Sequence, residues 1–192
     1  NECIGIIGES GSGKTTFVDI LLGLLKPTEG KVFINNELLS EKAYNFSGNI
    51  GYLPQEPLVL EESIKTNIAL EQDESKIDDK KIQDCIQKAN LEKVISKLPK
   101  GTKTLIGANG VRLSGGQNKR LALARTFYHG KKFIIMDEAT SSLDINAENY
   151  IAKEIESIKG KVTIIIISHS KNIMKHCDKI YEVKDKSIFL SK

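Results

Sequence analysis

The sequence Gly-Glu-Ser-Gly-Ser-Gly-Lys-Thr at residues 8–15 constrains the fold of this chain more than any other stretch. It fits the phosphate-binding pattern G-x-x-x-x-G-K-[ST], in which glycines let consecutive backbone N–H groups turn towards phosphate oxygens. The apolar run 3–7 predicts a buried strand, and residues 17–25 place apolar side chains at helical spacing. A strand, a glycine loop and a helix N-terminus, in that order, are the context in which this pattern binds phosphate.

We name residues 8–15 the phosphate loop, and its last two residues have distinct expected roles. Lys14 should reach the β- and γ-phosphates of a nucleotide, and the Thr15 hydroxyl should bind Mg²⁺. The alternative, a glycine turn followed by a solvated lysine, is disfavoured because every fixed position matches in the expected context. The predicted nucleotide contacts are Gly8, Glu9, Ser10, Gly11, Ser12, Gly13, Lys14, Thr15 and Thr16.

The composition is that of an ordinary globular domain. The 192 residues are sufficient for one domain, 40% of them are hydrophobic and 28% are charged. The net charge of +3 and the absence of a long basic block argue against nucleic acid as a partner. Three widely spaced cysteines predict reduced thiols in a cytosolic compartment rather than disulfides or a zinc site. No apolar run reaches membrane-spanning length and no signal peptide is visible, so we expect this stretch itself to be soluble.

Strand and helix signals alternate along the chain, which predicts an α/β fold. Dense apolar runs at 132–136 and 162–167 are typical of parallel strands that are buried on both faces. Residues 61–109 are instead helical, with apolar side chains on one face of the segment 82–89. The other predicted strands are 31–39, with a turn at Asn35 and Asn36, 49–53, and a hairpin at 179–190, and the other helices lie around 117–128 and 147–158.

Polar residues follow three of the predicted strands, at the edge where parallel α/β sheets bind ligands. Asp137 follows an apolar strand that would hold its carboxylate beside Mg²⁺, and Glu138 could accept a proton from the water that attacks the γ-phosphate. An acidic pair that caps the next helix is the alternative, but the phosphate loop favours the metal and base roles. His169 could donate a hydrogen bond to the γ-phosphate, and Gln55 could bind Mg²⁺ or position water.

The sequence Leu-Ser-Gly-Gly-Gln at residues 113–117, which we name the signature segment, is the second strong pattern. Its Ser-x-x-Gln spacing predicts a helix capping box, with Ser114 as the N-cap and Gln117 at the third helical position. A capped helix start with two glycines also exposes N–H groups to an anion. The structural and the anion-binding interpretations are therefore compatible.

The signature segment resembles that of the nucleotide-binding domains of ABC transporters. The resemblance extends over nearly the whole chain, because six motifs follow one another in that family's order. They are the phosphate loop, Gln55, the signature segment, Asp137 with Glu138, Ser142-Leu143-Asp144, and His169.

The resemblance implies that two such domains pair head to tail and enclose two ATP molecules. Each ATP would contact the phosphate loop of one domain and the signature segment of the other. Asp144 would carry contact between the two sites, and Gln55 would link the nucleotide to the membrane domain. The residues that would act in trans are Ser114, Gly115, Gly116 and Gln117.

Closer matches are to exporter-type members of the family. Residues 54–69 are similar to the segment that follows the family's glutamine, and residues 98–107 to the approach to the signature segment. In the residues that lead to the signature segment, Ala108 stands where the family usually has a glutamate. This difference affects the expected coupling to transmembrane helices and not the nucleotide chemistry. The family also stacks adenine on an aromatic residue upstream of the phosphate loop. No aromatic residue precedes Gly8, so we expect an N-terminally truncated domain.

The resemblance implies a single ABC-type ATPase domain over residues 1–192. Residues 1–60 and 110–192 would form a P-loop NTPase core with a mostly parallel sheet flanked by helices. Residues 61–109, together with the signature segment, would form a helical subdomain.

The function implied is ATP hydrolysis that powers export across a membrane, with ATP and Mg²⁺ as ligands. The implied partners are a second, identical nucleotide-binding domain and transmembrane domains, and the implied location is the cytoplasmic face of the cell (inner) membrane. A soluble ABC ATPase that acts on DNA or ribosomes is the alternative. It is disfavoured because the interval between the phosphate loop and the signature segment is compact, and because the chain has one such domain.

Overall fold

The computed structural model describes residues 1–34, 36–39, 48–141 and 143–191. Its main sheet contains β1 (Cys3–Ile7), β4 (Ile50–Leu53), β5 (Phe133–Asp137), β6 (Thr163–Ile167), β7 (Lys179–Lys184) and β8 (Ser187–Leu190). The strand order is β4-β5-β6-β1-β7-β8. All neighbours in this sheet pair in parallel except β7 and β8, which form the antiparallel hairpin expected at the end of the chain.

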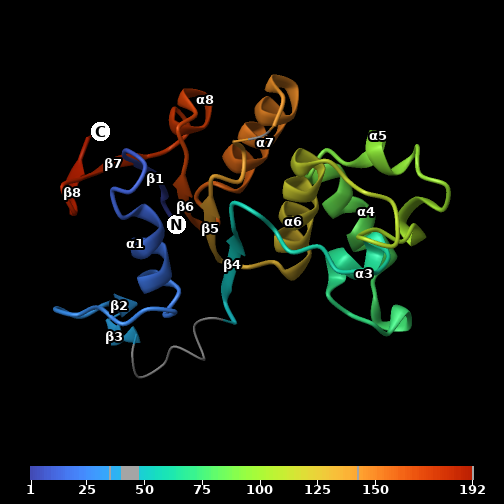
Figure 1. Cartoon of the computed structure of the whole chain (residues 1–192), viewed down its shortest axis with the longest axis horizontal. Helices are drawn as coiled ribbons and strands as arrows, with labels where there is room; N and C mark the ends of the chain where they lie inside the picture. The colour runs from blue at the N-terminus through green and yellow to red at the C-terminus, as the bar shows by residue number, and fades with distance from the viewer. Residues whose placement is uncertain (35, 40–47, 142, 192) are drawn as a thin grey trace.

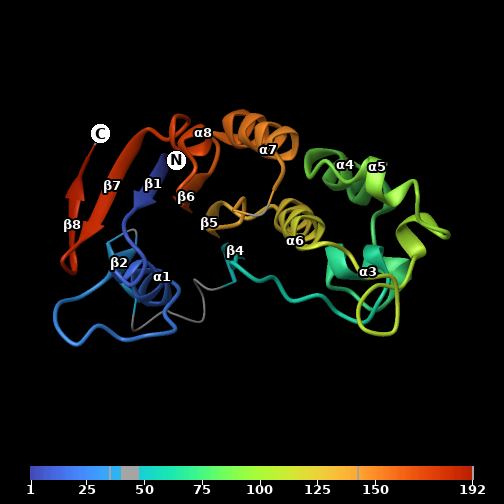
Figure 2. The same ribbon diagram turned by 45° about the horizontal axis from the view of Figure 1, so that its top comes forward.

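Helices cover both faces of the sheet (Figure 2). α1 (Lys14–Leu21) lies on one face, and α7 (Ile145–Ile158) and α8 (Lys171–Met174) lie on the other. Successive isoleucines of β6 point to opposite faces, so that Ile165 packs in the core with Val18 of α1 and Ile166 in the core with Ile151 of α7. The predicted α/β fold with doubly buried parallel strands is confirmed.

A third apolar core lies beside β4, at the other end of the molecule from β8 (Figure 1). It is built by α3 (Ile64–Ala69), α4 (Asp79–Lys88), α5 (Glu92–Ile95) and α6 (Gly115–His129), with short 3₁₀ turns at Glu74–Lys76 and Gly101–Lys103. Leu121 of α6 belongs to this core, whereas Leu123 packs in the core between the sheet and α7. α6 therefore joins the helical part of the molecule to the sheet.

The first helix is shorter than its apolar spacing predicts. α1 ends at Leu21, and Gly23, with a φ of 74°, turns the chain so that Leu24 and Leu25 are 69% and 47% exposed. A left-handed glycine directly after a helix is a common way for the helix to end. The prediction that the helical spacing extends to Leu24 and Leu25 is wrong.

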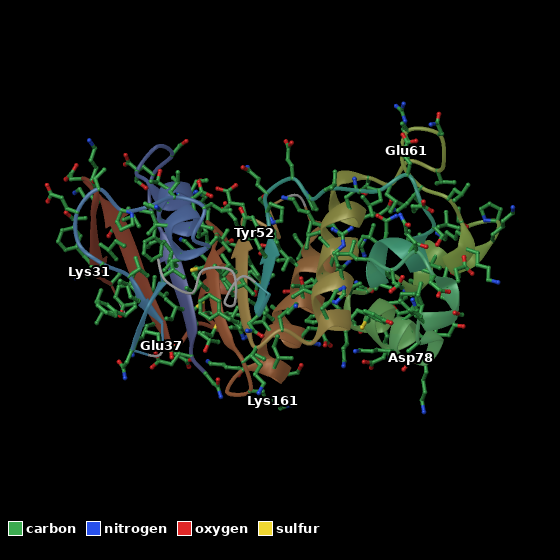
Figure 3. All side chains as sticks on the ribbon, turned by 90° about the horizontal axis from the view of Figure 1, so that it is seen from below. Lys31, Glu37, Tyr52, Glu61, Asp78 and Lys161 are labelled. Atoms are coloured by element: carbon green, nitrogen blue, oxygen red, sulfur yellow. The ribbon has the colours of Figure 1, made fainter. Side chains whose placement is uncertain are left out.

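The strand predicted at 31–39 is a small antiparallel hairpin of β2 (Phe33–Ile34) and β3 (Glu37–Leu38). Asn36 has a φ of 66°, as a tight turn requires, while Asn35 of the predicted turn lies outside the described residues. Lys31 and Glu37 mark this hairpin in Figure 3, at the opposite end of the molecule from Asp78. Among the described residues, no helix has the length and apolar character needed to cross a membrane.

The close approach of β4 to α6 depends on Gly51. A Cβ atom added there would lie 2.5 Å from Cγ2 of Thr126. We expect Gly51→Ala to lower the free energy of unfolding by about 1–3 kcal/mol, because α6 must shift away from the sheet. Urea unfolding followed by circular dichroism measures the change. Gly48→Ala is the matched control, with an expected change of about 0.5 kcal/mol or less, since a Cβ atom at Gly48 meets nothing within 4 Å. Equal losses in both variants would contradict this account.

Candidate functional site

The phosphate loop and the ends of three strands enclose one cavity of about 300 Å³. β4, β5 and β6 end at the same edge of the sheet as β1, because all four strands run in the same direction. The residues that line the cavity are Ser10, Gly11, Gly13, Lys14, Thr15, Thr16, Gln55, Asp137, Glu138 and His169. The fold thus brings together the residues that the sequence predicts for phosphate contact, metal binding and catalysis.

The backbone of the phosphate loop borders directly on this cavity. Gly11 and Gly13 have φ angles of 77° and 106°, which glycine adopts readily, and a Cβ atom added to either would meet nothing within 4 Å. Lys14 is buried, and its Nζ donates hydrogen bonds of 2.8 Å to the carbonyl oxygens of Gly8 and Glu9. The ammonium group and the N-terminus of α1 together make this side of the cavity electropositive.

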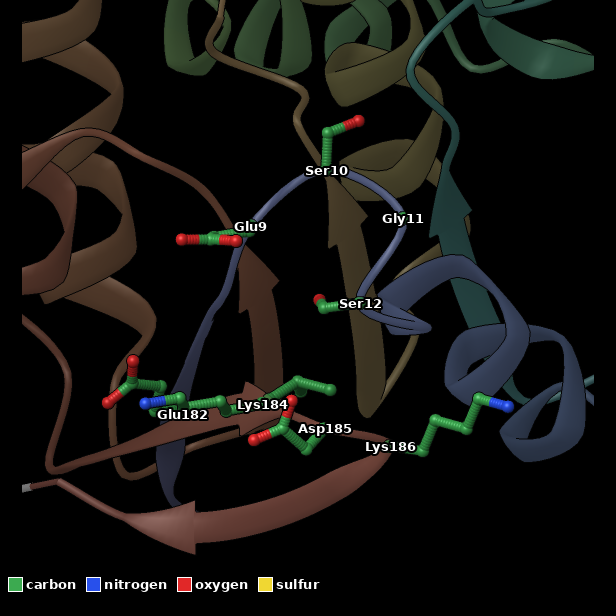
Figure 4. Close-up of a pocket in the computed structure, with 9 residues that line it drawn as sticks. Glu9, Ser10, Gly11, Ser12, Glu182, Lys184, Asp185 and Lys186 are labelled. Atoms are coloured by element: carbon green, nitrogen blue, oxygen red, sulfur yellow. The ribbon is translucent and has the colours of Figure 1, made fainter.

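The outer side of the phosphate loop borders a second cavity of about 400 Å³. Figure 4 shows the loop arching over β7 and the turn at 184–186 that leads to β8. Glu9 and Ser12 line this second cavity and not the first, whereas Ser10 and Gly11 border both. The predicted loop contacts therefore divide between the two sides of the loop.

Asp137 and Glu138 are neighbours at the end of β5 with different surroundings. Asp137 is buried, and burial followed by the charge of Glu138 raises the pKa of its carboxyl group, while Lys14 lowers it. Oε2 of Glu138 accepts a hydrogen bond of 3.1 Å from Nε2 of Gln55, and Oε1 lies 3.7 Å from Nε2 of His169. Both flanking side chains thus approach the same carboxylate, which lines the cavity together with the phosphate loop.

The cavity also offers the type of ligand that Mg²⁺ prefers. The hydroxyl of Thr15, the amide oxygen of Gln55 and the carboxylate of Asp137 are all oxygen donors. Within the described ranges, no group of three or more acidic, histidine or cysteine side chains is arranged to hold a metal. Mg²⁺ usually binds through one or two carboxylates together with substrate phosphates and water. The donor set therefore fits Mg²⁺ in company with a nucleotide.

The signature segment lies apart from this cavity. Ser114 and Gln117 form the predicted capping box at the start of α6, with the Gln117 N–H 3.3 Å from Oγ of Ser114 and the Ser114 N–H 2.8 Å from Oε1 of Gln117. Ser114 and Gly115 are exposed, and neither they nor Gly116 and Gln117 line the cavity. The capping prediction is confirmed, and any contact of this segment with a nucleotide must involve a nucleotide outside this cavity.

Asp144 also lies outside the cavity and caps α7, its Oδ1 accepting from the N–H groups of Asn146 and Ala147 at 3.1 and 3.0 Å. The alternative that Asp137 and Glu138 cap the next helix is therefore wrong, because Asp144 occupies that position. Ser142, part of the same motif, lies outside the described residues.

Lys119, which no sequence motif singles out, lies two residues after the signature segment and reaches Glu138 from α6. Its Nζ donates to the backbone oxygen of Glu138 at 2.9 Å and to Oγ of Ser141 at 2.8 Å. Its spacing could have indicated that it is buried, because Lys119 lies four residues before the buried Leu123 and therefore on the same face of the helix.

The family model described as "ABC transporter" matches residues 1–141. A protein named ATP-dependent lipid A-core flippase from Cupriavidus pinatubonensis is 33% identical over 181 residues, which are 93% of this chain and 31% of that protein. ABC transporter B family member 13 from Arabidopsis thaliana is 32% identical over 185 residues, 96% of this chain and 15% of that protein. The chain thus spans about a third or less of these curated relatives.

A solved structure, described as a bacterial Atm1-family ABC exporter with ATP bound, superimposes with a TM-score of 0.88 at 27% sequence identity. The match covers 96% of this chain and 32% of the exporter chain. The arrangement of strands and helices around the cavity is therefore that of an exporter's nucleotide-binding domain.

The capping box predicts a measurable contribution to stability that is independent of any ligand. Ser114→Ala removes the acceptor for the Gln117 N–H and should lower the free energy of unfolding by about 0.5–2 kcal/mol. Ser114→Asp supplies another acceptor and should restore most of this loss. Urea unfolding without nucleotide compares the three proteins. No difference between Ser114→Ala and the parent would mean that the cap does not stabilise α6.

Proposed function

Since this chain belongs to the ABC transporter family, we propose that it binds and hydrolyses ATP to power export across a membrane. The observation that carries the proposal is the single cavity that contains the phosphate loop together with Gln55, Asp137, Glu138 and His169. A phosphate-binding loop alone would support nucleotide binding. The acidic pair in the same cavity adds the groups that hydrolysis needs.

In the proposed reaction, the phosphate loop and the N-terminus of α1 hold the β- and γ-phosphates, and Lys14 exchanges its bonds to Gly8 and Glu9 for phosphate oxygens. Thr15, Asp137 and Gln55 hold Mg²⁺, which neutralises part of the phosphate charge when it is bound. The change of partners at Lys14 is favourable because its buried ammonium group then faces an anion rather than neutral carbonyl groups.

Glu138 is the proposed general base. Its carboxylate faces the cavity and is flanked by the amide of Gln55 and the imidazole of His169. A water molecule between this carboxylate and the γ-phosphate would lose its proton to Glu138 as it attacks phosphorus. In this proposal Gln55 orients the carboxylate, and His169 donates a hydrogen bond to the γ-phosphate.

We further propose that two copies of the domain pair head to tail around two ATP molecules. The exposed signature segment lies outside the cavity of its own chain, so a nucleotide held by a second copy is the ligand that it can reach. The capped start of α6, with the glycines at 115 and 116, offers backbone N–H groups to that nucleotide. Asp144, exposed at the start of α7, would contact the partner copy.

The proposed transmembrane partner would be contacted at the cytoplasmic face of the membrane through the segment that follows Gln55. Residues 54–69 resemble the exporter segment that follows the family's glutamine, but within this segment α3 is buried throughout against the helical core and is not available for the contact. The exposed part of the segment is limited to Gln55, Glu56, Leu58, Glu61 and Glu62. Leu58 is 71% exposed and would be the main apolar contact.

The role of Glu138 predicts a separation of binding from hydrolysis. Glu138→Gln keeps the size of the side chain and removes its basic oxygen, so the rate of ATP hydrolysis should fall by about 10²–10⁴-fold. The dissociation constant for ATP should change little, because the phosphate loop is untouched. Phosphate release and calorimetric titration measure the two quantities. Near-normal turnover in the variant would exclude Glu138 as the base.

The trans role of the signature segment predicts a defect that only the dimer shows. In a Glu138→Gln background, Ser114→Arg should prevent ATP-dependent dimerisation in size-exclusion chromatography, because a bulky side chain would enter the interface. Binding of ATP to the monomer should be retained. Ser114→Ala is the matched control, since it also loses the cap. Dimerisation of the arginine variant equal to that of the control would leave the segment with a capping role alone.

A further inference from the structure

Lys119 is a buried ammonium group that the proposed mechanism does not use. The residue is 7% exposed, and its Nζ donates to the backbone oxygen of Glu138 at 2.9 Å and to Oγ of Ser141 at 2.8 Å. Both acceptors are neutral groups in the loop that follows β5. A buried charge with neutral acceptors is costly compared with an apolar side chain of equal length, which indicates a role other than packing.

The environment of Lys119 is also acidic at longer range. Burial lowers the pKa of its ammonium group, while the charges of Glu138, Glu56 and Asp137 raise it. These three carboxyl groups belong to two segments, one after β4 and one at the end of β5. The ammonium group thus lies where the signature helix α6 meets the acidic wall of the cavity.

Both the backbone N–H and the backbone carbonyl of Glu138 form hydrogen bonds. Its N–H donates to the carbonyl of Ile167 at 2.9 Å, which ties it to β6. Its carbonyl accepts from Nζ of Lys119, from Oγ of Ser141 at 2.9 Å and from the N–H of Ser141 at 3.1 Å. Glu138 has a φ of 47°, in the left-handed region that a glutamate rarely adopts. Such a conformation persists only where the surrounding contacts enforce it.

We propose that Lys119 is a positioning residue for Glu138, holding its carbonyl oxygen so that the carboxylate points into the cavity. The proposal rests on the proposed function, because it assumes that Glu138 accepts the proton in ATP hydrolysis. Without the ammonium group, the carbonyl keeps only its two hydrogen bonds from Ser141, and rotation about the N–Cα bond of Glu138 can relax its left-handed φ. The carboxylate would then leave its place beside Gln55 and His169.

The same contact joins the signature segment to the catalytic carboxylate. Lys119 lies on α6, the helix that begins at the capping box of Ser114. A continuous helix moves as a unit over so short a distance, so a shift of its N-terminus also shifts Nζ of Lys119. Engagement of the signature segment by a nucleotide of a second copy is therefore coupled to the orientation of Glu138 in the same chain.

Lys119→Met is the decisive variant, because methionine retains most of the length and removes the ammonium group. In the natural protein that carries this sequence, we expect kcat for ATP hydrolysis to fall by about 10–100-fold, the loss typical of a misplaced catalytic group. KM and the dissociation constant for ATP should stay within about threefold, since the phosphate loop is intact. Lys153→Met, at an exposed lysine of α7, is the matched control and should hydrolyse ATP like the parent.

A double-mutant cycle separates positioning from a general structural effect. If Lys119 acts through Glu138, Lys119→Met should cause little further loss in a Glu138→Gln background, so that the two effects are strongly non-additive. An equal fold-loss in both backgrounds would overturn the proposal, as would a kcat for Lys119→Met within about twofold of the parent.

Ser141→Ala is a second variant that tests the same contact if Lys119→Met does not fold. It removes the hydroxyl that accepts from Nζ and donates to the Glu138 carbonyl, at an exposed position. We expect a smaller fall in kcat, about 3–10-fold, with an unchanged KM. An unchanged kcat in this variant would overturn the proposal. Absence of hydrolysis in the parent and in Lys153→Met would instead overturn the proposed function.

Discussion

The parallel pairing of β1 with its neighbours is the constraint on which the rest of the structure depends. In this register Ile6 lies beside Ile167, and Asp137 lies on the other side of the same residue. Since parallel strands end at the same edge, the phosphate loop, the acidic pair and the histidine after β6 reach one cavity from distant parts of the sequence. Isoleucines that are buried on both faces of β5 and β6 hold these strand ends in place.

α6 is the second element on which the site depends. Its N-terminus is capped by Ser114 and Gln117, its apolar side chains enter two different cores, and Lys119 reaches the loop after β5. The packing of Gly51 under Thr126 brings β4 close to the same helix. The helical part and the sheet therefore meet along one rigid element, and the signature segment lies at the exposed end of that element.

Several residues around the cavity have buried charges or unfavourable backbone conformations, which lower the stability of the chain when no ligand is bound. Asp137 is a buried carboxyl group with a raised pKa, Lys14 and Lys119 are buried cations, and Glu138 has a left-handed backbone. Such features concentrate at functional sites, because the groups must be arranged before the ligand arrives. Bound phosphates and a divalent cation would offset much of this cost, since they bring the opposite charges to Lys14 and Asp137.

The sequence by itself determined the features that depend on neighbouring residues. The phosphate loop between a strand and a helix, the capping box of α6 and the closing hairpin all follow from local spacing and turn chemistry. The family resemblance also anticipated which strand ends meet. Tertiary structure alone decided that α3 is buried despite its polar Lys65, Thr66 and Asn67, because Asn67 bonds to the segment before it and to Arg125 on α6. It also decided that Lys119 holds the carbonyl of Glu138, 19 residues away. Helical spacing places Lys119 on a buried face of α6, but the backbone group that it meets there depends on how α6 packs against the sheet.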